Sequence, residues 1–321
     1  MHMPDGYMNL ATAVGGAAVA AAGIWTSLRQ TGRRLAERQI PMAGLTAAFV
    51  FAVQMINFPV AAGTSGHLLG GALAAILLGP WMGALVGTVV VVVQALLFAD
   101  GGIVSLGLNV LNLSLVTALG GWVVFRLMMR LLPRSTGAAI AATMVAGFLS
   151  VLAGSFAFVV EYAIGGQGGA PLPTVLAAMT GVHSLIGIGE GLISSVAVGA
   201  VLAVRPDLVT GTTDINLRRT VTAPGRRGIM SFVIVGLVVA LTLVFVVAPF
   251  ASDNPDGLER VAIDQGFSSA ATGGGRLLAN YEVSGIESKR LGTMLAGAAG
   301  VAVVFVLGLG VVSMLRRRRD A

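Results

Sequence analysis

Long apolar runs separated by short charged clusters constrain this chain more than any other feature of its sequence. Of its residues, 56% are hydrophobic and only 11% are charged, whereas a soluble domain carries about 25% charged residues. Several runs approach or exceed the roughly 20 residues that cross the hydrocarbon core of a bilayer. The pattern predicts an all-α fold, a polytopic bundle of membrane helices. The predicted spans fall near residues 8–28, 41–58, 67–80, 82–98, 103–130, 137–164, 174–204, 229–250 and 292–315.

The spans divide into two groups on either side of a polar stretch that contains Pro and Gly. We expect a seven-span bundle over residues 1–204, a cytoplasmic linker over 205–228 and a two-span companion module over 229–321. The companion module is expected to carry an extracytoplasmic segment between its two spans. The third run, near residues 67–80, is short and rich in glycine, so it is expected to be tilted, broken or partly re-entrant.

Arginine clusters orient the predicted spans. They follow the first, fifth, seventh and ninth spans, so an N-terminus outside the cell places all four on the cytoplasmic side, as the positive-inside rule requires. The opposite orientation places every cluster outside. The pattern therefore predicts a multi-pass protein of the bacterial cell (inner) membrane with an extracytoplasmic N-terminus and a cytoplasmic C-terminus. The clusters are Arg29–Arg38, Arg126–Arg134, Arg205–Arg227 and Arg316–Arg319.

The N-terminal segment lacks the pattern of a cleaved signal peptide. Such a peptide has a basic region before its apolar core and small residues at a cleavage site after it. Here the opening MHMPDGYMN contains no Lys or Arg and includes Asp5, while the basic cluster comes after the apolar run. We therefore expect Met1 to remain on the chain.

Residue types missing from the sequence exclude several kinds of chemistry. The chain has no cysteine, so it forms neither disulfides nor thiolate metal sites. The sequence contains no G-x-x-x-x-G-K-[ST] loop of the kind that cradles nucleotide phosphates. It also shows no nucleophile–base pair and no soluble catalytic domain. The chain is therefore not predicted to be an enzyme, and any step driven by ATP is expected on separate subunits.

The first two residues form a candidate metal chelate. The amine of Met1, the backbone amide of His2 and the Nδ1 atom of the His2 imidazole can close two adjacent chelate rings around one ion. A fourth nitrogen would complete the square-planar N4 arrangement that Ni(II) and Cu(II) favour. Pro4, Asp5 and Gly6 are turn-forming residues that can fold the tail back toward the bundle. An ordinary exposed tail is the alternative interpretation.

His67 is the candidate for the fourth nitrogen. It precedes the third run at the extracytoplasmic side, where His2 is also expected, so the two imidazoles can meet without crossing the bilayer. Gly63, Gly66 and Gly70 leave room for a backbone segment to pack beside it. A histidine at the membrane interface with a satisfied hydrogen bond is the alternative interpretation.

His183 and Glu190 lie in the seventh run, seven residues apart and therefore on one helical face. Ionisable residues inside a membrane usually face a cavity or another polar group, so the pair is a candidate second metal station or proton relay. A structural polar network is the alternative. Other polar residues are candidates to line a cavity or to orient the metal ligands from outside: Gln54, Asn57, Thr64, Ser65, Gln94, Asn109 and Asn112.

Four stretches of the sequence resemble one transporter family. MHMPDGY at the start, FAVQMINFPVAAGTSGHLLGG at 51–71 and GVHSLIGIGEGLI at 181–193 resemble the substrate-binding membrane subunit (M component) of energy-coupling-factor nickel/cobalt transporters. NPDGLE at 254–259 resembles the small companion subunit (N component) of the same systems, here fused to the C-terminus. The resemblance covers essentially the whole chain. Taken alone, the acidic residues of 255–259 would either attract cations or form a solvated turn.

The resemblance implies a seven-helix unit whose extracytoplasmic N-terminus plugs into the bundle. It also implies that the Met1 amine, the His2 amide and imidazole and the His67 imidazole hold the metal. Met3 stands where the family more often has Ile, and the PDG that follows looks like the nickel branch, as does PDGLE. We therefore expect Ni(II) as the transported substrate, with Co(II) as the alternative, and no catalytic cofactor.

The function expected from these features is high-affinity nickel capture for an uptake transporter. The metal is expected to bind from outside, in a planar site that disfavours Zn(II) because Zn(II) prefers tetrahedral coordination. A separate transmembrane coupling subunit and cytoplasmic ABC-type ATPases are the expected partners, besides membrane lipid, and no nucleic acid is expected. The alternative is a membrane metal sensor or assembly subunit that transports nothing.

Overall fold

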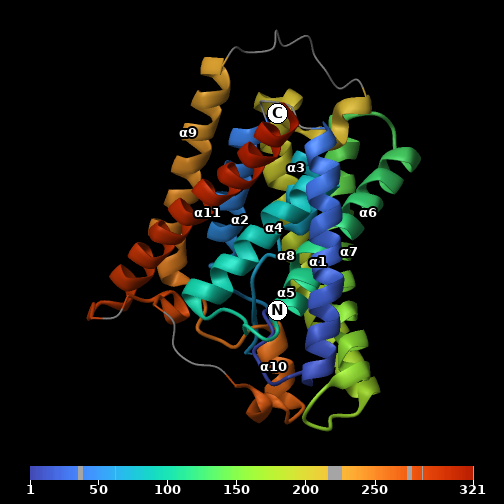
Figure 1. Cartoon of the computed structure of the whole chain (residues 1–321), viewed down its shortest axis with the longest axis vertical. Coiled ribbons are helices and arrows are strands. Elements are labelled where there is room, and N and C mark those ends of the chain that lie inside the picture. The colour runs from blue at the N-terminus through green and yellow to red at the C-terminus, as the bar shows by residue number, and fades with distance from the viewer. Residues whose placement is uncertain (35–38, 62, 216–225, 273–276, 284, 321) are drawn as a thin grey trace.

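The computed structural model describes residues 1–34, 39–61, 63–215, 226–272, 277–283 and 285–320, and these ranges are mostly helical (Figure 1). The α-helices are α1 (Leu10–Arg34), α2 (Gln39–Gln54), α3 (Gly71–Leu78), α4 (Pro80–Val93), α5 (Leu106–Val110), α6 (Thr117–Leu131), α7 (Thr136–Gly165), α8 (Leu172–Val204), α9 (Arg226–Thr242), α10 (Gly257–Asp264) and α11 (Lys289–Asp320). The predicted all-α class is confirmed.

Shorter elements extend or connect these helices. The π-helical turns are Gln94–Phe98, Leu111–Val116 and Leu243–Val247, and the 3-10 turns are Pro206–Leu208, Thr210–Ile215, Ala248–Phe250, Ser268–Ala270 and Ala279–Tyr281. Strands β1 (Phe58–Pro59) and β2 (Ser65–Gly66) pair in antiparallel fashion, with Phe58 opposite Gly66 and Pro59 opposite Ser65. This small hairpin immediately precedes His67.

Seven helical segments in the described ranges are long and apolar enough to cross a membrane. They are Leu10–Arg33, Pro80–Leu97, Leu106–Leu131, Thr136–Gly165, Leu172–Val204, Gly228–Phe250 and Lys289–Arg317. Helix α2 is also apolar but has only 16 residues. The chain is a multi-pass membrane protein, as its apolar runs predicted.

The third apolar run forms only the eight-residue helix α3, and every residue of this helix is buried. At 1.5 Å per residue, α3 covers about 12 Å, whereas the hydrocarbon core is about 30 Å thick. Gly79, with φ at 93°, ends α3, and Pro80 begins α4. Helix α4 packs tightly on α3, because a Cβ on Gly83 would lie 2.5 Å from the backbone nitrogen of Ala75. The expectation of a broken third run is confirmed.

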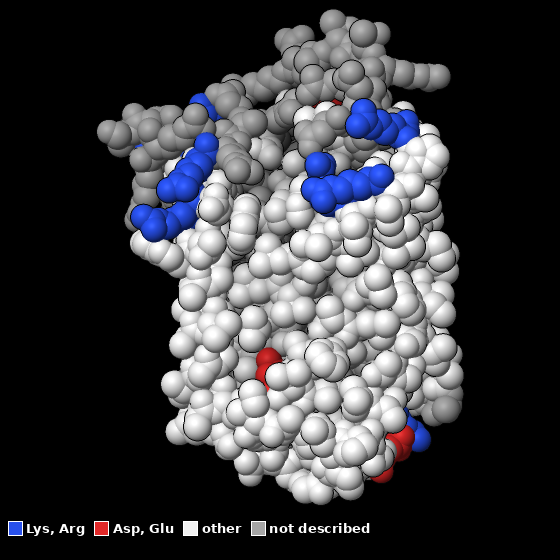
Figure 2. Space-filling view, turned by 90° about the vertical axis from the view of Figure 1, so that its right-hand side faces the viewer, with Lys and Arg blue, Asp and Glu red and all other residues white. Residues whose placement is uncertain are grey.

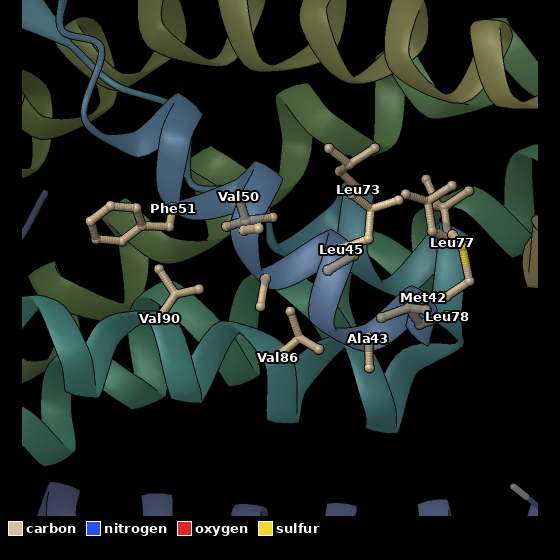
Figure 3. Packing of buried hydrophobic residues seen from close by; sticks show 14 of the residues in the cluster. Met42, Ala43, Leu45, Val50, Phe51, Leu73, Leu77, Leu78, Val86 and Val90 are labelled. Atoms are coloured by element: carbon tan, nitrogen blue, oxygen red, sulfur yellow. The ribbon is translucent and has the colours of Figure 1, made fainter. Parts of the chain in front are cut away.

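Helices α2, α3 and α4 share an apolar core (Figure 3). Phe51 of α2, Leu73 of α3 and Val90 of α4 have no exposed surface. Helices α9 and α11 of the companion module pack against α2, on the left of Figure 1. Gly44 of α2 and Gly300 of α11 permit this close approach, as small residues do between membrane helices. The companion module therefore shares a core with the rest of the chain.

Basic side chains gather toward one end of the molecule. On the face shown in Figure 2, a band of Lys and Arg lies toward the end where Figure 1 marks the C-terminus, beside a belt with few charged side chains. Helix α10 lies at the opposite end (Figure 1). Of the expected linker 205–228, residues 216–225 lie outside the described residues, as does Arg38.

Candidate metal site

The first residues of the chain form a buried tail rather than an exposed one. Met1, His2 and Met3 are 5%, 7% and 1% exposed. Asn109 holds the tail by its backbone, because its Oδ1 accepts a hydrogen bond from Met3 N at 2.8 Å and its Nδ2 donates to Met3 O at 2.9 Å. The two bonds use both the acceptor and the donor end of the amide on one peptide segment. Asn109 therefore fixes where the tail enters the bundle.

The PDG turn that follows is held from two sides. The Asp5 carboxylate accepts hydrogen bonds from Ser105 N at 2.8 Å and from Ile103 N at 3.1 Å. Ser105 Oγ donates to Pro4 O at 3.0 Å, and Thr272 N donates to Asp5 O at 2.7 Å. The bundle and the companion module therefore both hold the turn, consistent with the turn chemistry predicted for this segment.

The Met1 amine lies beside His67. Its nitrogen is 2.8 Å from His67 Nε2, and the two histidine rings stack with centroids 5.0 Å apart and an interplanar angle of 24°. His67 Nδ1 lies 2.9 Å from the carbonyl oxygen of Leu68. A carbonyl only accepts hydrogen bonds, so the proton sits on Nδ1 and the lone pair on Nε2. His67 thus presents an unprotonated ring nitrogen to the amine.

His2 presents its other ring nitrogen. Its Nε2 lies 3.0 Å from Gln94 Oε1, and the Gln94 amide nitrogen donates to Tyr281 Oη at 3.1 Å, which orients the amide. The proton of the neutral imidazole therefore sits on Nε2, and Nδ1, whose polar neighbour is Asp100 Oδ1, makes no hydrogen bond to the described residues. Nδ1 is the atom that the predicted chelate requires.

The surroundings of the His2 imidazole favour its neutral form. Burial lowers its pKa to about 4, and the nearby carboxylate of Asp100, which favours the charged form, does not offset this. His2 Nδ1 approaches Asp100 Oδ1 to 3.0 Å, and the two form an ion pair only when the ring is protonated. Tyr281 Oη donates to the other oxygen of Asp100 at 2.6 Å. For His2, the neutral imidazole is the form that binds metal.

The loop after His67 is held by buried side chains of two helices. The Glu190 carboxylate accepts hydrogen bonds from Leu69 N at 2.6 Å and from Gly70 N at 3.0 Å. Gln54 Nε2 donates to Leu69 O at 2.7 Å. This geometry favours the structural alternative for Glu190, which orients the loop that carries His67.

His183 lies apart from Glu190 in its contacts. Its side chain is fully buried, Nδ1 donates to Met179 O at 2.9 Å, and Nε2 has no hydrogen-bond partner among the described residues. A Cβ on Gly257 would lie 3.1 Å from His183 Cε1, so the ring lies directly beneath α10. The two side chains of the predicted pair therefore share no hydrogen-bond partner among the described residues.

Three further predicted residues lie where the hairpin meets the companion module. Ser65 N donates to Pro255 O at 2.9 Å, and Ser252 N donates to Asn57 O at 2.8 Å. Thr64 closes the hairpin loop by accepting from Val60 N at 2.9 Å through its backbone oxygen. These residues anchor segments near the site rather than facing the candidate donors.

Sequence reasoning missed the role of Asp256. Its Oδ2 lies 2.8 Å from the Met1 amine nitrogen and 3.8 Å from His67 Nε2. Burial alone raises the pKa of Asp256, but its charged and hydrogen-bonding neighbours, the Met1 amine first among them, outweigh this effect and hold the pKa well below its usual value. The PDGLE segment stood out in the sequence, yet no sequence feature indicated that Asp256 contacts Met1, 255 positions earlier in the chain. No feature of the sequence marked Asp100 or Tyr281 as residues of the site.

The donors at this site are mainly nitrogens. Within the residues that the structure describes, no three His, Asp or Glu side chains form a metal-binding group. Two imidazoles, the terminal amine and the intervening amide of His2 offer four nitrogens, and nitrogen sets of this kind suit late transition metals.

Comparison with known proteins identifies the family. A family model described as the cobalt uptake substrate-specific transmembrane region (CbiM) matches residues 2–208. The chain belongs to this family. A second model, the PDGLE domain, matches residues 230–317. The resemblance seen in the sequence, to a CbiM-type membrane subunit fused to a PDGLE companion, is therefore confirmed.

Individual relatives of this CbiM-family chain cover most or all of it. A putative fused nickel transport protein, NikMN, of Archaeoglobus fulgidus is 33% identical over 98% of this chain and 99% of its own length. The cobalt transport protein CbiM of Geobacter sulfurreducens is 34% identical over 65% of this chain and 61% of its own length. A crystal structure of a truncated transition metal transporter superposes with a TM-score of 0.56 at 28% identity, covering 63% of this chain and 99% of that one.

Proposed function

We propose that this chain captures Ni(II) for uptake by an energy-coupling-factor transporter. The observation that carries the proposal is the 2.8 Å separation between the Met1 amine nitrogen and His67 Nε2. Two nitrogens at 90° around one ion, with bonds of roughly 2.0 Å, lie about 2.8 Å apart. The amine and His67 therefore already have the spacing of adjacent ligands.

The remaining donors complete a planar set. Starting from the Met1 amine, the chelate runs through the His2 amide to His2 Nδ1, the nitrogen that Gln94 leaves without a proton. Four nitrogens in a plane favour Ni(II), and the relative from Archaeoglobus fulgidus is named for nickel. Co(II) is the second candidate, because the family description and the Geobacter relative are named for cobalt.

The charge distribution supports capture from outside. On the face shown in Figure 2, basic side chains gather toward the end where Figure 1 marks the C-terminus, and the positive-inside rule assigns that end to the cytoplasm. Helix α10 and the tail then face outside. Release inward is assigned to partners, a transmembrane coupling subunit and cytoplasmic ATPases on separate chains.

Nickel titration of the purified chain tests the site. Wild type is expected to bind one Ni(II) per chain and to develop the visible absorption band of square-planar nickel. Two alanines added before Met1 should abolish this band, because they displace the amine from the chelate and leave the histidine too far from the new terminus to form another planar site, while two alanines added after the last residue should leave it unchanged. His67→Ala should weaken binding by at least roughly 100-fold, since even residues that only orient a ligand cost 10–100-fold. Unchanged affinity in the N-terminally extended chain would rule out this site.

Radioactive nickel uptake separates transport from sensing. Cells that carry the chain together with its coupling subunit and ATPases should accumulate nickel, and cells with the His67→Ala chain should not. Tight nickel binding without uptake would contradict transport and favour a sensor or assembly subunit.

A further inference from the structure

We propose that Asp256, in the companion module, is a positioning residue of the metal site that holds the Met1 amine beside His67 and balances the charge of the bound ion. The inference rests on the proposed function and deepens it, because it gives the PDGLE segment a part in metal binding. Asp256 Oδ2 lies 2.8 Å from the amine nitrogen, and the side chains of Met1 and Asp256 are 2% and 18% exposed. An ion pair so shielded from water is screened far less than a surface pair.

The amine has two partners, one from each part of the chain. Its nitrogen lies 2.8 Å from His67 Nε2 and 2.8 Å from Asp256 Oδ2. The two acceptor atoms, His67 Nε2 and Asp256 Oδ2, are 3.8 Å apart, so they contact the amine from different directions. A free N-terminus is otherwise one of the most mobile parts of a chain. Asp256 therefore restricts the motion of the Met1 amine before metal binds, so that metal binding itself costs less conformational entropy.

Asp256 is itself fixed by the start of α10. It is the N-cap residue of this helix, and its Oδ1 accepts a hydrogen bond from Glu259 N at 2.8 Å. One carboxylate oxygen thus caps the helix while the other faces the amine. The helix is seated closely on α8, because a Cβ on Gly257 would lie 2.8 Å from Ile186 Cδ1. The position of the carboxylate is set by packing, not by a mobile loop.

The same segment is attached to the loop that carries His67. Ser65, two residues before His67, donates from its backbone nitrogen to Pro255 O at 2.9 Å and from its hydroxyl to Asn254 O at 2.7 Å. Both residues immediately precede Asp256. The carboxylate and the imidazole that hold the amine are therefore held to each other as well.

Charge explains why a carboxylate suits this position. A divalent ion bound to three neutral nitrogens and one deprotonated amide leaves a net charge of +1 in a buried site. An uncompensated buried charge is costly, and the carboxylate cancels it. Groups that support metal ligands from outside in this way typically change metal affinity by 10–100-fold when they are removed.

The test compares Asp256→Asn with Asp256→Glu in the full-length chain. Asn remains a good N-cap, so α10 keeps its start while the negative charge and one acceptor are lost. Glu keeps the charge one methylene further from the backbone. Asp264→Asn is the matched control. Asp264 lies on the same helix, pairs with Arg260 and is far more exposed than Asp256. Circular dichroism and thermal unfolding check that all variants fold.

Two measurements read out the proposal. In nickel titrations, Asp256→Asn should bind about 10–100-fold more weakly than wild type with an unchanged square-planar band, because the four nitrogens remain, while Asp256→Glu should lie between the two. In the metal-free chain, an amine-reactive label should modify Met1 faster in Asp256→Asn than in wild type. Lys289, the only lysine, serves as the internal reference.

The outcomes separate this inference from the proposed function. Equal nickel affinity and equal Met1 labelling in Asp256→Asn and wild type would overturn the role of Asp256 while leaving nickel capture intact. An equal loss in Asp264→Asn would also overturn it, because the effect would then belong to the helix. A wild-type chain that binds no nickel would overturn both.

Discussion

Each histidine at the site is held by the nitrogen that faces away from the other donors. His67 Nδ1 donates to a backbone carbonyl, whereas His2 Nε2 donates to the side chain of Gln94. The hydrogen-bond acceptor of His67 belongs to the backbone, so no side-chain substitution removes it. The acceptor of His2 is a side chain, so substitution of Gln94 removes it. Gln94 is therefore the residue whose replacement can release the tautomer of a candidate ligand.

Gln94→Leu is expected to weaken nickel binding by about 10–100-fold. Leucine removes the acceptor for His2 Nε2–H, so the proton is free to occupy Nδ1 and to block the metal. Competition with a chromophoric nickel chelator measures the affinity. Gln167→Leu, on an exposed loop residue, is the control and should bind as wild type does. Wild-type affinity in Gln94→Leu would show that the amide does not set the tautomer.

The short helix α3 matters at the scale of elements. Its eight buried residues leave the segment before it, residues 65–70, inside the bundle rather than at the surface. Backbone groups at such depth need protein partners, because lipid supplies none. Glu190 of α8 and Gln54 of α2 supply them. The break in the third span is thus what places His67 within reach of the tail.

Glu190→Gln tests this support. The glutamine amide offers only one acceptor oxygen, so Leu69 N or Gly70 N loses its partner, and a buried unpaired donor costs about 1–3 kcal/mol. The free energy of unfolding should fall by that amount, and nickel affinity should fall with it. Glu287→Gln, at an exposed position, is the control. A variant that loses stability but keeps its nickel affinity would show that the support of the loop by Glu190 does not affect metal binding.

The charge asymmetry belongs to the whole molecule. The N-terminal tail lies in the half of the bundle toward α10, away from the basic end (Figure 1), so the orientation in the membrane decides which side the candidate site faces. The companion module packs on α2 at mid-bundle and reaches the tail at Asp5 through Thr272. Binding and the fused module therefore cannot be considered separately in this chain.

Because the chain has no cysteine, single cysteines can map the orientation. Gln167→Cys lies beside the tail, since Gln167 N donates to Tyr7 O, and Thr136→Cys lies at the other end of α7. In spheroplasts, a membrane-impermeant maleimide should label the first and not the second. After permeabilisation both should react. The reverse pattern would place the candidate site in the cytoplasm and contradict capture from outside.

The family and seven of the nine predicted spans agree with the sequence prediction, because run length and motif order are local properties, whereas the runs near residues 41–58 and 67–80 form helices of only 16 and 8 residues. The meeting of the Met1 amine with His67 was also anticipated, since both were assigned to one side of the membrane; metal binding there remains a prediction. Asp256 was not predictable as a partner, because its contact with Met1 depends on how α10 seats on α8. Gln94 was one of several polar residues in apolar runs, and only the fold shows which of them touches His2.

The contact between Met1 and Asp256 joins residues 255 positions apart, and this separation has a consequence for biosynthesis. Ribosomes add about 5–20 residues per second, so Asp256 is made roughly 13–51 s after Met1. During that interval the first residue of the protein lacks one of the partners that hold it, although most of the bundle has already been inserted. The first residues synthesised are therefore among the last to reach their final place.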